Sequence, residues 1–211
     1  TVRDLNIDGC YNAYEAARRE GVRRFIFASS NHAVGFHRRT RVLDDQVVPR
    51  PDTRYGVSKV FGEAMGRMYA DKHNMQVACL RIGTFKIPDE PEQSRQLLSW
   101  ISHRDMAQLV RCCIDHPAYH FIVAYGVSNN TRSRWSNRHV DFLGYAAQDN
   151  SETYAEEILA KAIPEDPVAA PFHGDFLISN LQVENLRDLV YALTHLRDFT
   201  AMQALRPLTL S

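Results

Sequence analysis

The sequence predicts an α/β protein built around a doubly wound parallel sheet. Three apolar runs, at residues 22–28, 76–82 and 121–125, alternate with longer segments whose apolar residues recur at helical spacing. A continuous apolar run is typical of a strand covered on both faces, and strands that alternate with helices are typical of a parallel sheet. Because such sheets bind ligands beyond the carboxyl ends of their strands, functional residues are expected directly after the runs.

Length and composition are those of an ordinary globular protein. The 211 residues allow one sizeable domain, and 45% of them are hydrophobic and 24% charged. The 25 basic and 25 acidic side chains balance, which argues against nucleic acid or an anionic membrane as a partner. The sequence has neither an apolar run near the ~18 residues of a membrane span nor a signal-peptide pattern at its start, so a cytoplasmic location is expected. The four cysteines form no Cys-x-x-Cys pair, which predicts buried thiols and no metal site.

The first half of the chain is expected to contain a helix, a strand, a loop and a second helix. Residues 2–20 have helical spacing and end at Gly21, and the strand 22–28 follows. Residues 32–53 are polar and interrupted by prolines, which indicates a surface loop. A helix is predicted over residues 55–73, with an apolar stripe formed by Val60, Phe61, Ala64, Met65, Met68 and Tyr69.

The second half continues the alternation and then changes character. The strand 76–82 ends at Gly83 and Thr84, a loop covers 86–95, and 96–100 is a short segment of undecided type. Ser102 is expected to cap a helix at 103–116, and after the strand 121–125 two more helices are expected at 135–143 and 151–162. Three prolines from residue 164 onward mark a linker, and 183–205 predict a terminal helix for docking or dimerisation. The expected division is therefore into residues 1–166 and a small, mostly helical portion at 167–211.

One set of side chains points to proton transfer. Tyr55 and Lys59 are four residues apart on the predicted helix and so share one face, where the ammonium can lie beneath the phenol and favour its ionised form. A free phenol has a pKa near ~10, too high for a base at neutral pH without such help. Ser30 follows the first strand, and its hydroxyl can bond the same substrate oxygen. These residues predict a site that moves a proton on or off an alcohol.

The set resembles a known family. Ser30, Tyr55 and Lys59, with Asn6 in the preceding helix, resemble the Asn-Ser-Tyr-Lys tetrad of the extended short-chain dehydrogenase/reductases, the NAD-dependent epimerase/dehydratase family. Within that family, the sequence around these residues is similar to that of the uronate dehydrogenases. The matching stretches are Ser29-Ser30-Asn31-His32 followed by Gly35, and Tyr55-Gly56-Val57-Ser58-Lys59. The resemblance extends over residues 6 to 166 and implies a Rossmann-like fold with NAD as the cofactor.

The resemblance also implies roles for individual residues. Tyr55 would be the base that takes the proton from the C1 hydroxyl of a hexuronate, galacturonate or glucuronate, which is oxidised to an aldarolactone. Lys59 would lower the pKa of Tyr55 and hold the nicotinamide ribose. Ser30 would bond the reacting oxygen, and Asn6 would support the lysine through water. Ile82 would join Tyr55 and Lys59 in binding the cofactor.

A sugar acid as substrate requires a cation and several polar side chains. Arginine suits a carboxylate because its guanidinium can make two parallel bonds. The resemblance implies that this arginine is Arg95, which precedes Leu97-Leu98-Ser99-Trp100. Asn31 and His32 would bond sugar hydroxyls, and Thr84 stands where the family usually has serine. The expected partner is thus a small sugar acid, and the sequence leaves assembly as a homo-oligomer open.

Two departures from the family pattern keep alternatives open. The sequence contains no Gly-x-Gly-x-x-Gly, the turn that holds the NAD pyrophosphate in this family, so the sheet is expected to be incomplete on its N-terminal side. The segment Gly83-Thr84-Phe85-Lys86 replaces the family's Asn-x-Tyr-Gly-Pro type segment, which argues against a nucleotide-sugar substrate. The alternatives are a sugar epimerase or dehydratase of the same superfamily, and a truncated non-catalytic module that binds no NAD.

Overall fold

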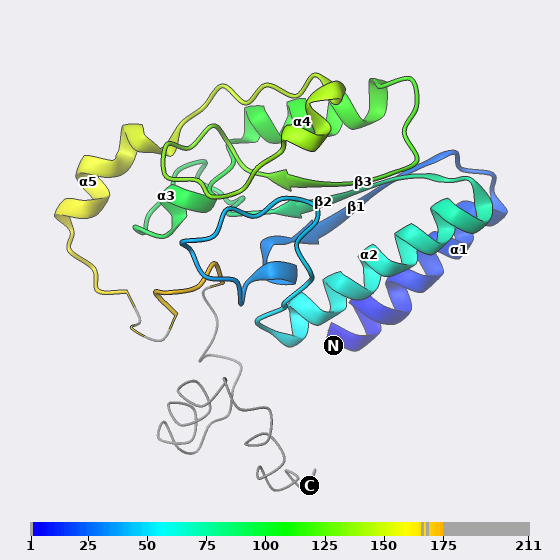
Figure 1. The fold of residues 1–211 in the computed structure, drawn as a ribbon, viewed down its shortest axis with the longest axis horizontal. Coiled ribbons are helices and arrows are strands. Elements are labelled where there is room, and N and C mark those ends of the chain that lie inside the picture. Colours follow the sequence, from blue (N-terminus) through cyan, green and yellow to red (C-terminus); the bar gives the residue numbers. More distant parts are fainter. Residues whose placement is uncertain (1, 166, 168, 175–211) are drawn as a thin grey trace, which may run out of the picture. The chain divides into compact units, whose positions relative to one another are not determined.

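The computed structural model describes residues 2–165, 167 and 169–174. In that part of the chain a parallel sheet has the order β1-β2-β3, with α1 and α2 on one face and α4 on the other (Figure 1). The strands are β1 (Arg24–Ser30), β2 (Gln76–Ile82) and β3 (Phe121–Gly126). The α-helices are α1 (Gly9–Arg19), α2 (Arg54–His73), α3 (Gln96–Ser99), α4 (His103–Asp115) and α5 (Ala155–Ala160). The predicted α/β class and parallel sheet are confirmed.

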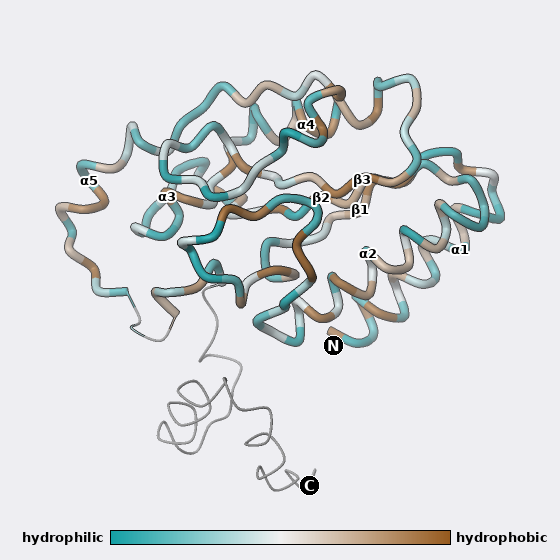
Figure 2. Tube along the Cα trace, in the orientation of Figure 1, coloured by the Kyte–Doolittle hydropathy of each residue, from teal (hydrophilic) through white to brown (hydrophobic). Residues whose placement is uncertain are grey.

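The sheet has two apolar faces because successive side chains of a strand point to opposite sides. On β2, Val77 and Cys79 pack with α1 and α2, whereas Ala78 and Leu80 pack with α4. The strands are accordingly coloured mostly as hydrophobic in Figure 2. This double cover explains why the strands are continuous apolar runs in the sequence.

The strand bounds place functional residues at one edge. The predicted strand 76–82 is confirmed as β2, whereas the first strand lies two residues later than predicted, at Arg24–Ser30. Ser30 pairs with Ile82, and Ile82 pairs with Gly126. Ser30 is therefore the last residue of β1, at the carboxyl edge where ligands of such sheets bind.

The N-terminal helix is interrupted where a candidate residue lies. A π-helical turn at Asp4–Asp8 precedes α1, and Gly21 ends the helical segment with a φ of +66°. Such π turns are often found at functional sites. Asn6 lies in the middle of this one, which the helical spacing of the sequence did not indicate.

Most of the apolar stripe predicted for α2 is confirmed, because Phe61, Met65, Met68 and Tyr69 pack in the core beside α1. Ala64, also assigned to the stripe, is exposed, whereas Gly62, Glu63 and Gly66 are buried. A Cβ atom at Gly62 would lie 2.1 Å from the ring of Phe27 on β1. The helix lies so close to the sheet that its contact face includes glycines, which apolar periodicity does not mark.

The loop at 32–53 was predicted to lie on the surface, and this is wrong. Its residues Val34, Leu43 and Val47 are buried in a cluster with Tyr125 and Trp135. A 3-10 helix at Asn31–Val34 opens the loop. The loop thus has an apolar core of its own, because its few apolar residues meet others that lie far away in the sequence.

The two helices predicted after β3 form only in part. The helix expected at 135–143 is a 3-10 helix at Arg138–Leu143, because Trp135 is instead paired with Leu43 of the loop. The helix expected at 151–162 is a 3-10 helix at Ser151–Tyr154 followed by α5. Its cap is the side chain of Asn150, which accepts from the Glu152 amide at 2.9 Å.

The proline-rich segment packs against the loop. The amides of His173 and Gly174 donate to the carbonyls of His37 (3.0 Å) and Gly35 (2.8 Å), and the Arg39 amide donates to the Pro171 carbonyl (3.0 Å). The described part of the expected linker is therefore attached to residues 35–41. The predicted helix at 183–205 lies outside the described residues, and the division at 166/167 stays a prediction.

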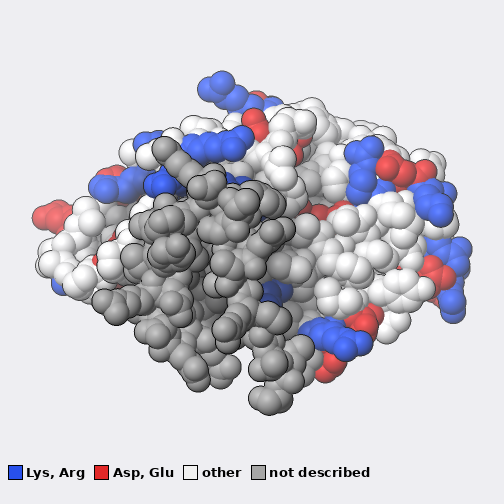
Figure 3. Space-filling model, turned by 60° about the horizontal axis from the view of Figure 1, so that its bottom comes forward, with Lys and Arg blue, Asp and Glu red and all other residues white. Residues whose placement is uncertain are grey.

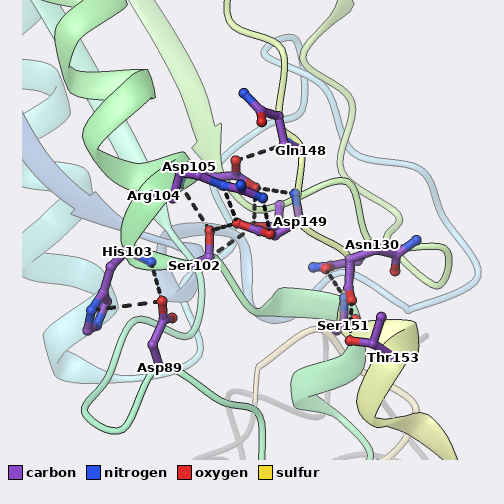
Figure 4. A network of polar contacts seen from close by, with 12 residues as sticks. Asp89, Ser102, His103, Arg104, Asp105, Asn130, Gln148, Asp149, Ser151 and Thr153 are labelled. Carbon is purple, nitrogen blue, oxygen red and sulfur yellow. Dashed lines mark hydrogen bonds and ion pairs between the residues drawn. The ribbon is translucent and has the colours of Figure 1, made fainter.

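A buried carboxylate connects α4 to a later segment of the chain. Ser102 caps α4 as predicted, and the side chain of Asp105, fully buried, accepts bonds from the Ser128 hydroxyl (2.6 Å) and from the amides of Gln148 (2.9 Å) and Asp149 (3.0 Å). Figure 4 shows Gln148 and Asp149 beside Asp105. The network holds the loop after β3 and the segment before α5 against the start of α4.

Two further expectations concern membranes and thiols. None of the helices among the described residues has the length and apolarity that a membrane crossing requires. All four cysteines are free thiols, and Cys10, Cys79 and Cys113 are buried while Cys112 is half-buried. Buried thiols were predicted, and three of the four fit.

Candidate active site

The start of α2 brings Tyr55 and Lys59 to the carboxyl edge of the sheet. Thr53 caps the helix by accepting from the Gly56 amide at 2.8 Å. The Lys59 ammonium donates to the Ala28 carbonyl of β1 at 2.8 Å and lies 5.1 Å from the centre of the Tyr55 ring. The one-turn spacing thus places the cation beneath the aromatic ring, and the bond to β1 holds it there.

The pKa of Tyr55 is shifted in the direction opposite to the one expected. Burial raises the pKa of Tyr55, and only its hydrogen bond with Ser30 acts to lower it. The Lys59 ammonium lies below the ring and donates to a backbone carbonyl, and burial has the larger effect on the pKa of Tyr55. The lowering of this pKa by Lys59 stays a prediction. Burial also lowers the pKa of Lys59. Among the candidate residues, Ser30 is the one that favours the phenolate.

Ser30 is at the centre of the polar groups that follow β1. Its hydroxyl accepts from the His32 amide at 3.2 Å and donates to the side-chain oxygen of Asn31 at 3.2 Å. Ser30, Asn31 and His32 are all buried. The 3-10 turn after the strand folds these three side chains together, as their place at the carboxyl edge suggested.

Asn6 is attached to α2 through a serine. Its amide nitrogen donates to the Ser58 hydroxyl at 3.1 Å, and Ser58 donates to the Tyr55 carbonyl at 2.6 Å. The π turn therefore contacts the first turn of α2 beside Tyr55. The expected support of Lys59 by Asn6 through water stays a prediction.

His32 has a partner that the sequence did not reveal. Its Nδ1 lies 2.9 Å and 3.0 Å from the two carboxylate oxygens of Asp52, and the Asp52 side chain is fully buried. The His32 ring meets the Tyr55 ring edge-on, with 5.9 Å between ring centres. Asp52 lies in a polar, proline-flanked stretch, and no sequence signal marked it as a buried carboxylate.

Arg95 lies in a partly buried position at the start of α3. One of its terminal nitrogens donates to the His173 carbonyl at 3.0 Å. Burial and the nearby Arg39 lower the pKa of Arg95, while Glu165 and Asp52 act in the opposite direction. Its charge therefore interacts with the carboxylate that holds His32, although 43 residues separate Asp52 from Arg95 in the sequence.

Ile82 and Thr84 lie on the neighbouring strand and just beyond it. Ile82 is the register partner of Ser30. Thr84 is paired with Trp100, and its hydroxyl hydrogen-bonds that of Ser99 at 2.8 Å. The sheet edge thus gathers Ser30, Ile82 and Thr84 as their positions after strands suggested, but no contact links Thr84 to Tyr55 among the described interactions.

A buried ion pair lies under this edge. The Arg81 guanidinium makes two bonds to the Glu63 carboxylate, at 2.9 Å and 2.8 Å, and Ser29 donates to the same carboxylate at 2.6 Å. Glu63 is one turn beyond Lys59 on α2, and Ser29 precedes Ser30 on β1. The pair therefore fixes α2 against the two strands that carry the candidate residues.

Figure 3 shows that basic and acidic side chains are both present on the surface, as the balanced charge implies.

The parallel sheet, with helices on both faces, defines an α/β protein of the Rossmann type. Ser30, Tyr55 and Lys59 lie together at the carboxyl edge of this sheet. The model of the NAD dependent epimerase/dehydratase family matches residues 2–112. The chain belongs to this family, as its resemblance predicted.

The chain is also similar to individual members of this family. The chain is 41% identical to a uronate dehydrogenase of Agrobacterium fabrum, over 83% of this chain and 66% of that protein. It is 40% identical to an NAD-dependent glucose-6-phosphate dehydrogenase of Haloferax volcanii, over 72% of this chain and 63% of that protein. A crystal structure of a tyrosine-to-alanine variant of uronate dehydrogenase from Agrobacterium tumefaciens, complexed with NAD, is 40% identical, with a TM-score of 0.79 over 83% of this chain and 66% of that one. The chain thus spans slightly less than two thirds of the length of these relatives.

Proposed function

We propose that this chain carries the proton-transfer and substrate-binding residues of an NAD-dependent dehydrogenase that oxidises C1 of a hexuronate to an aldarolactone. The observation that carries the proposal is the cluster at the sheet edge, where Lys59 lies 5.1 Å from the centre of the Tyr55 ring and Ser30 acts to lower the pKa of Tyr55. The similarity to a uronate dehydrogenase, at 41% identity, supports the choice of substrate.

The residues around Tyr55 fit the nicotinamide end of NAD. The Lys59 ammonium has three donors, and the Ala28 carbonyl accepts from it at 2.8 Å, so the group has capacity to hold ribose hydroxyls. Tyr55, Lys59 and Ile82 are the residues proposed to contact the cofactor. Bound NAD supplies the acceptor for the C1 hydride.

A residue of the chain accepts the proton. As the C1–H bond breaks and its electron pair leaves with the hydride, the C1 hydroxyl loses its proton to the Tyr55 phenolate. The electron pair of the O–H bond then forms the carbonyl of the lactone. Ser30 favours the phenolate form of Tyr55 before the substrate binds, which its effect on the pKa supports. Its single hydroxyl proton then bonds the reacting oxygen. Asn6 supports Lys59 through water in this proposal.

Arg95 is proposed to bind the carboxylate of the sugar acid. Burial makes its charged form less favourable, so an anion that pairs with it gains more than it would at an exposed arginine. Asn31, His32 and Thr84 are proposed to bond the sugar hydroxyls. Together these side chains would recognise a small, free sugar acid.

Replacing the proposed base tests the mechanism. Tyr55→Phe removes the hydroxyl that takes the proton, and turnover of uronate should decrease by about 100-fold or more. The measurement is NADH formation under saturating uronate and NAD. Tyr11→Phe, at a tyrosine 51% exposed on α1, is the matched control and should keep normal turnover. Unimpaired turnover in Tyr55→Phe would exclude Tyr55 as the base.

Replacing the proposed carboxylate partner tests the substrate. Arg95→Ala should raise KM for galacturonate and glucuronate by about tenfold or more, since a charge-assisted hydrogen bond contributes about 1.5–3 kcal/mol. KM for NAD should stay unchanged, because Arg95 is not among the proposed cofactor contacts. An equal KM for uronate in the wild type and in Arg95→Ala would exclude Arg95 as the partner of the substrate carboxylate.

A substrate panel separates the remaining alternatives. Glucose 6-phosphate belongs in the panel because the Haloferax volcanii relative is 40% identical, and UDP-sugars test the epimerase or dehydratase alternative. Turnover of either class without turnover of uronates would replace the present proposal. Calorimetric titration of NAD into the chain tests the other alternative, a non-catalytic module that binds no NAD.

A further inference from the structure

Asp52 is a buried carboxylate with a specific geometry. Its two oxygens lie 2.9 Å and 3.0 Å from Nδ1 of His32, and none of its side chain is exposed. The backbone adds to this contact, because the Asp52 amide donates to the His32 carbonyl at 3.3 Å. A buried carboxylate needs hydrogen-bond partners, and His32 provides the closest one described.

The surrounding backbone leaves room for this carboxylate. A Cβ atom at Gly35 would lie 2.3 Å from Oδ2 of Asp52, and one at Gly174 would lie 1.5 Å from the same oxygen. The two glycines are themselves joined, since the Gly174 amide donates to the Gly35 carbonyl at 2.8 Å. Two segments far apart in the sequence therefore meet over Asp52, and any side chain at either position would push the carboxylate away from His32.

We propose that Asp52 is a positioning residue that fixes His32 as the tautomer with its proton on Nδ1, so that Nε2 accepts a hydrogen bond from a sugar hydroxyl beside Tyr55. An ionised carboxylate can only accept, so it selects the imidazole form that donates from Nδ1. The ring is already placed edge-on to Tyr55. The role of Nε2 rests on the proposed function, whereas the tautomer does not.

The tautomer can be measured without turnover. In long-range ¹H–¹⁵N correlation spectra of the full chain, with imidazole in its neutral form, His32 should show a protonated Nδ1 and an unprotonated Nε2. Asp52→Asn provides an amide that can also donate, so the single form should give way to a mixture or to the opposite tautomer. Gly174→Ala keeps the acid but removes its space, and it should have the same effect. A wild-type His32 protonated on Nε2, or an unchanged spectrum in Asp52→Asn, would overturn the proposal.

Asp105→Asn is the matched control, because Asp105 is another fully buried carboxylate that holds a serine and two amides and has no bond to His32. It should leave the His32 resonances unchanged. Equal changes in both variants would mean that His32 responds to lost stability rather than to Asp52, and the proposal would fail.

Kinetics then test the consequence for the substrate. Asp52→Asn should raise KM for the uronate about tenfold while KM for NAD stays constant. An unchanged KM for uronate would refute the binding role of Nε2 even if the tautomer is as proposed. If wild-type chain turns over no uronate, the proposed function fails, and the spectra still decide whether Asp52 sets the tautomer.

Discussion

At Tyr55, burial and hydrogen bonding act on the phenol in opposite directions. Burial disfavours the phenolate and raises the pKa, while the bond with Ser30 favours the phenolate and lowers it. Lys59 lies under the ring, 5.1 Å from its centre, and is bonded to a carbonyl. In the proposed mechanism the serine therefore has a second role besides bonding the substrate oxygen, because it also favours the phenolate form of Tyr55.

The pH dependence of Ser30→Ala follows from this balance. Without the serine hydroxyl the pKa of Tyr55 should increase, because the group that stabilises the phenolate is lost while burial remains. A smaller fraction of Tyr55 is then ionised at any given pH, so the rising limb of the profile of kcat/KM against pH should move to higher pH. Absorbance titration of the tyrosines, with Tyr55→Phe as the reference that lacks this group, gives the same quantity without turnover. A limb that stays in place or moves to lower pH would contradict the assignment.

At the level of elements, α2 is the helix that carries the site and it is docked by glycine. Cβ atoms at Gly62 and Gly66 would lie 2.1 Å from the Phe27 ring and 2.6 Å from the Tyr14 hydroxyl. The buried Glu63 next to Gly62 accepts from Arg81 on β2. The close approach brings the carboxylate within reach of the strand and sets the height of Tyr55 above the sheet edge.

Gly62→Ala tests this close approach. Alanine normally stabilises a helix by about 1 kcal/mol over glycine, but here the new methyl overlaps the Phe27 ring, and overpacking costs about 1–3 kcal/mol. The net effect of these two terms should be a decrease in the free energy of unfolding, measured by urea denaturation, of up to about 2 kcal/mol. Gly9→Ala is the control, because the nearest atom to its added methyl is at 3.4 Å, and that variant should be neutral or more stable. A gain in stability for Gly62→Ala would disprove the close packing of α2.

At the level of the whole molecule, separate segments depend on a few buried polar groups. Asp105 at the start of α4 collects the Ser128 hydroxyl and the amides of Gln148 and Asp149 (Figure 4). The residues joined in this way come from three places in the sequence: the first turn of α4, the loop after β3 and the segment before α5. If the carboxylate were lost, the buried Ser128 hydroxyl and the two partly buried amides would each lose this acceptor.

Asp105→Ala should be among the more destabilising substitutions in the chain. An unsatisfied buried donor costs about 1–3 kcal/mol, and three donors lose their acceptor, so the free energy of unfolding should decrease by about 3 kcal/mol or more. Urea denaturation measures the change. Asp71→Ala, at an exposed carboxylate paired with Arg67, is the comparison and should cost no more than about 1 kcal/mol. Similar losses for the two variants would mean that the network around Asp105 contributes little.

The sequence by itself determined those features that depend on neighbouring residues. The apolar runs gave the parallel strands, and the interval between Tyr55 and Lys59 gave their common helix face. The place of Ser30 after a run gave its position at the carboxyl edge. In each case the property follows from the backbone repeat, and no knowledge of distant residues is required.

Only the tertiary structure decided which distant groups meet. It joined Asp52 to His32, attached residues 169–174 to the loop at 35–41, and gave the polar-looking loop a buried core. It also reversed the expected shift in the pKa of Tyr55, since the balance between burial and Ser30 depends on the positions of atoms from two elements. Interactions of this kind act through space and have no period along the chain, and so the spacing of residues could not encode them.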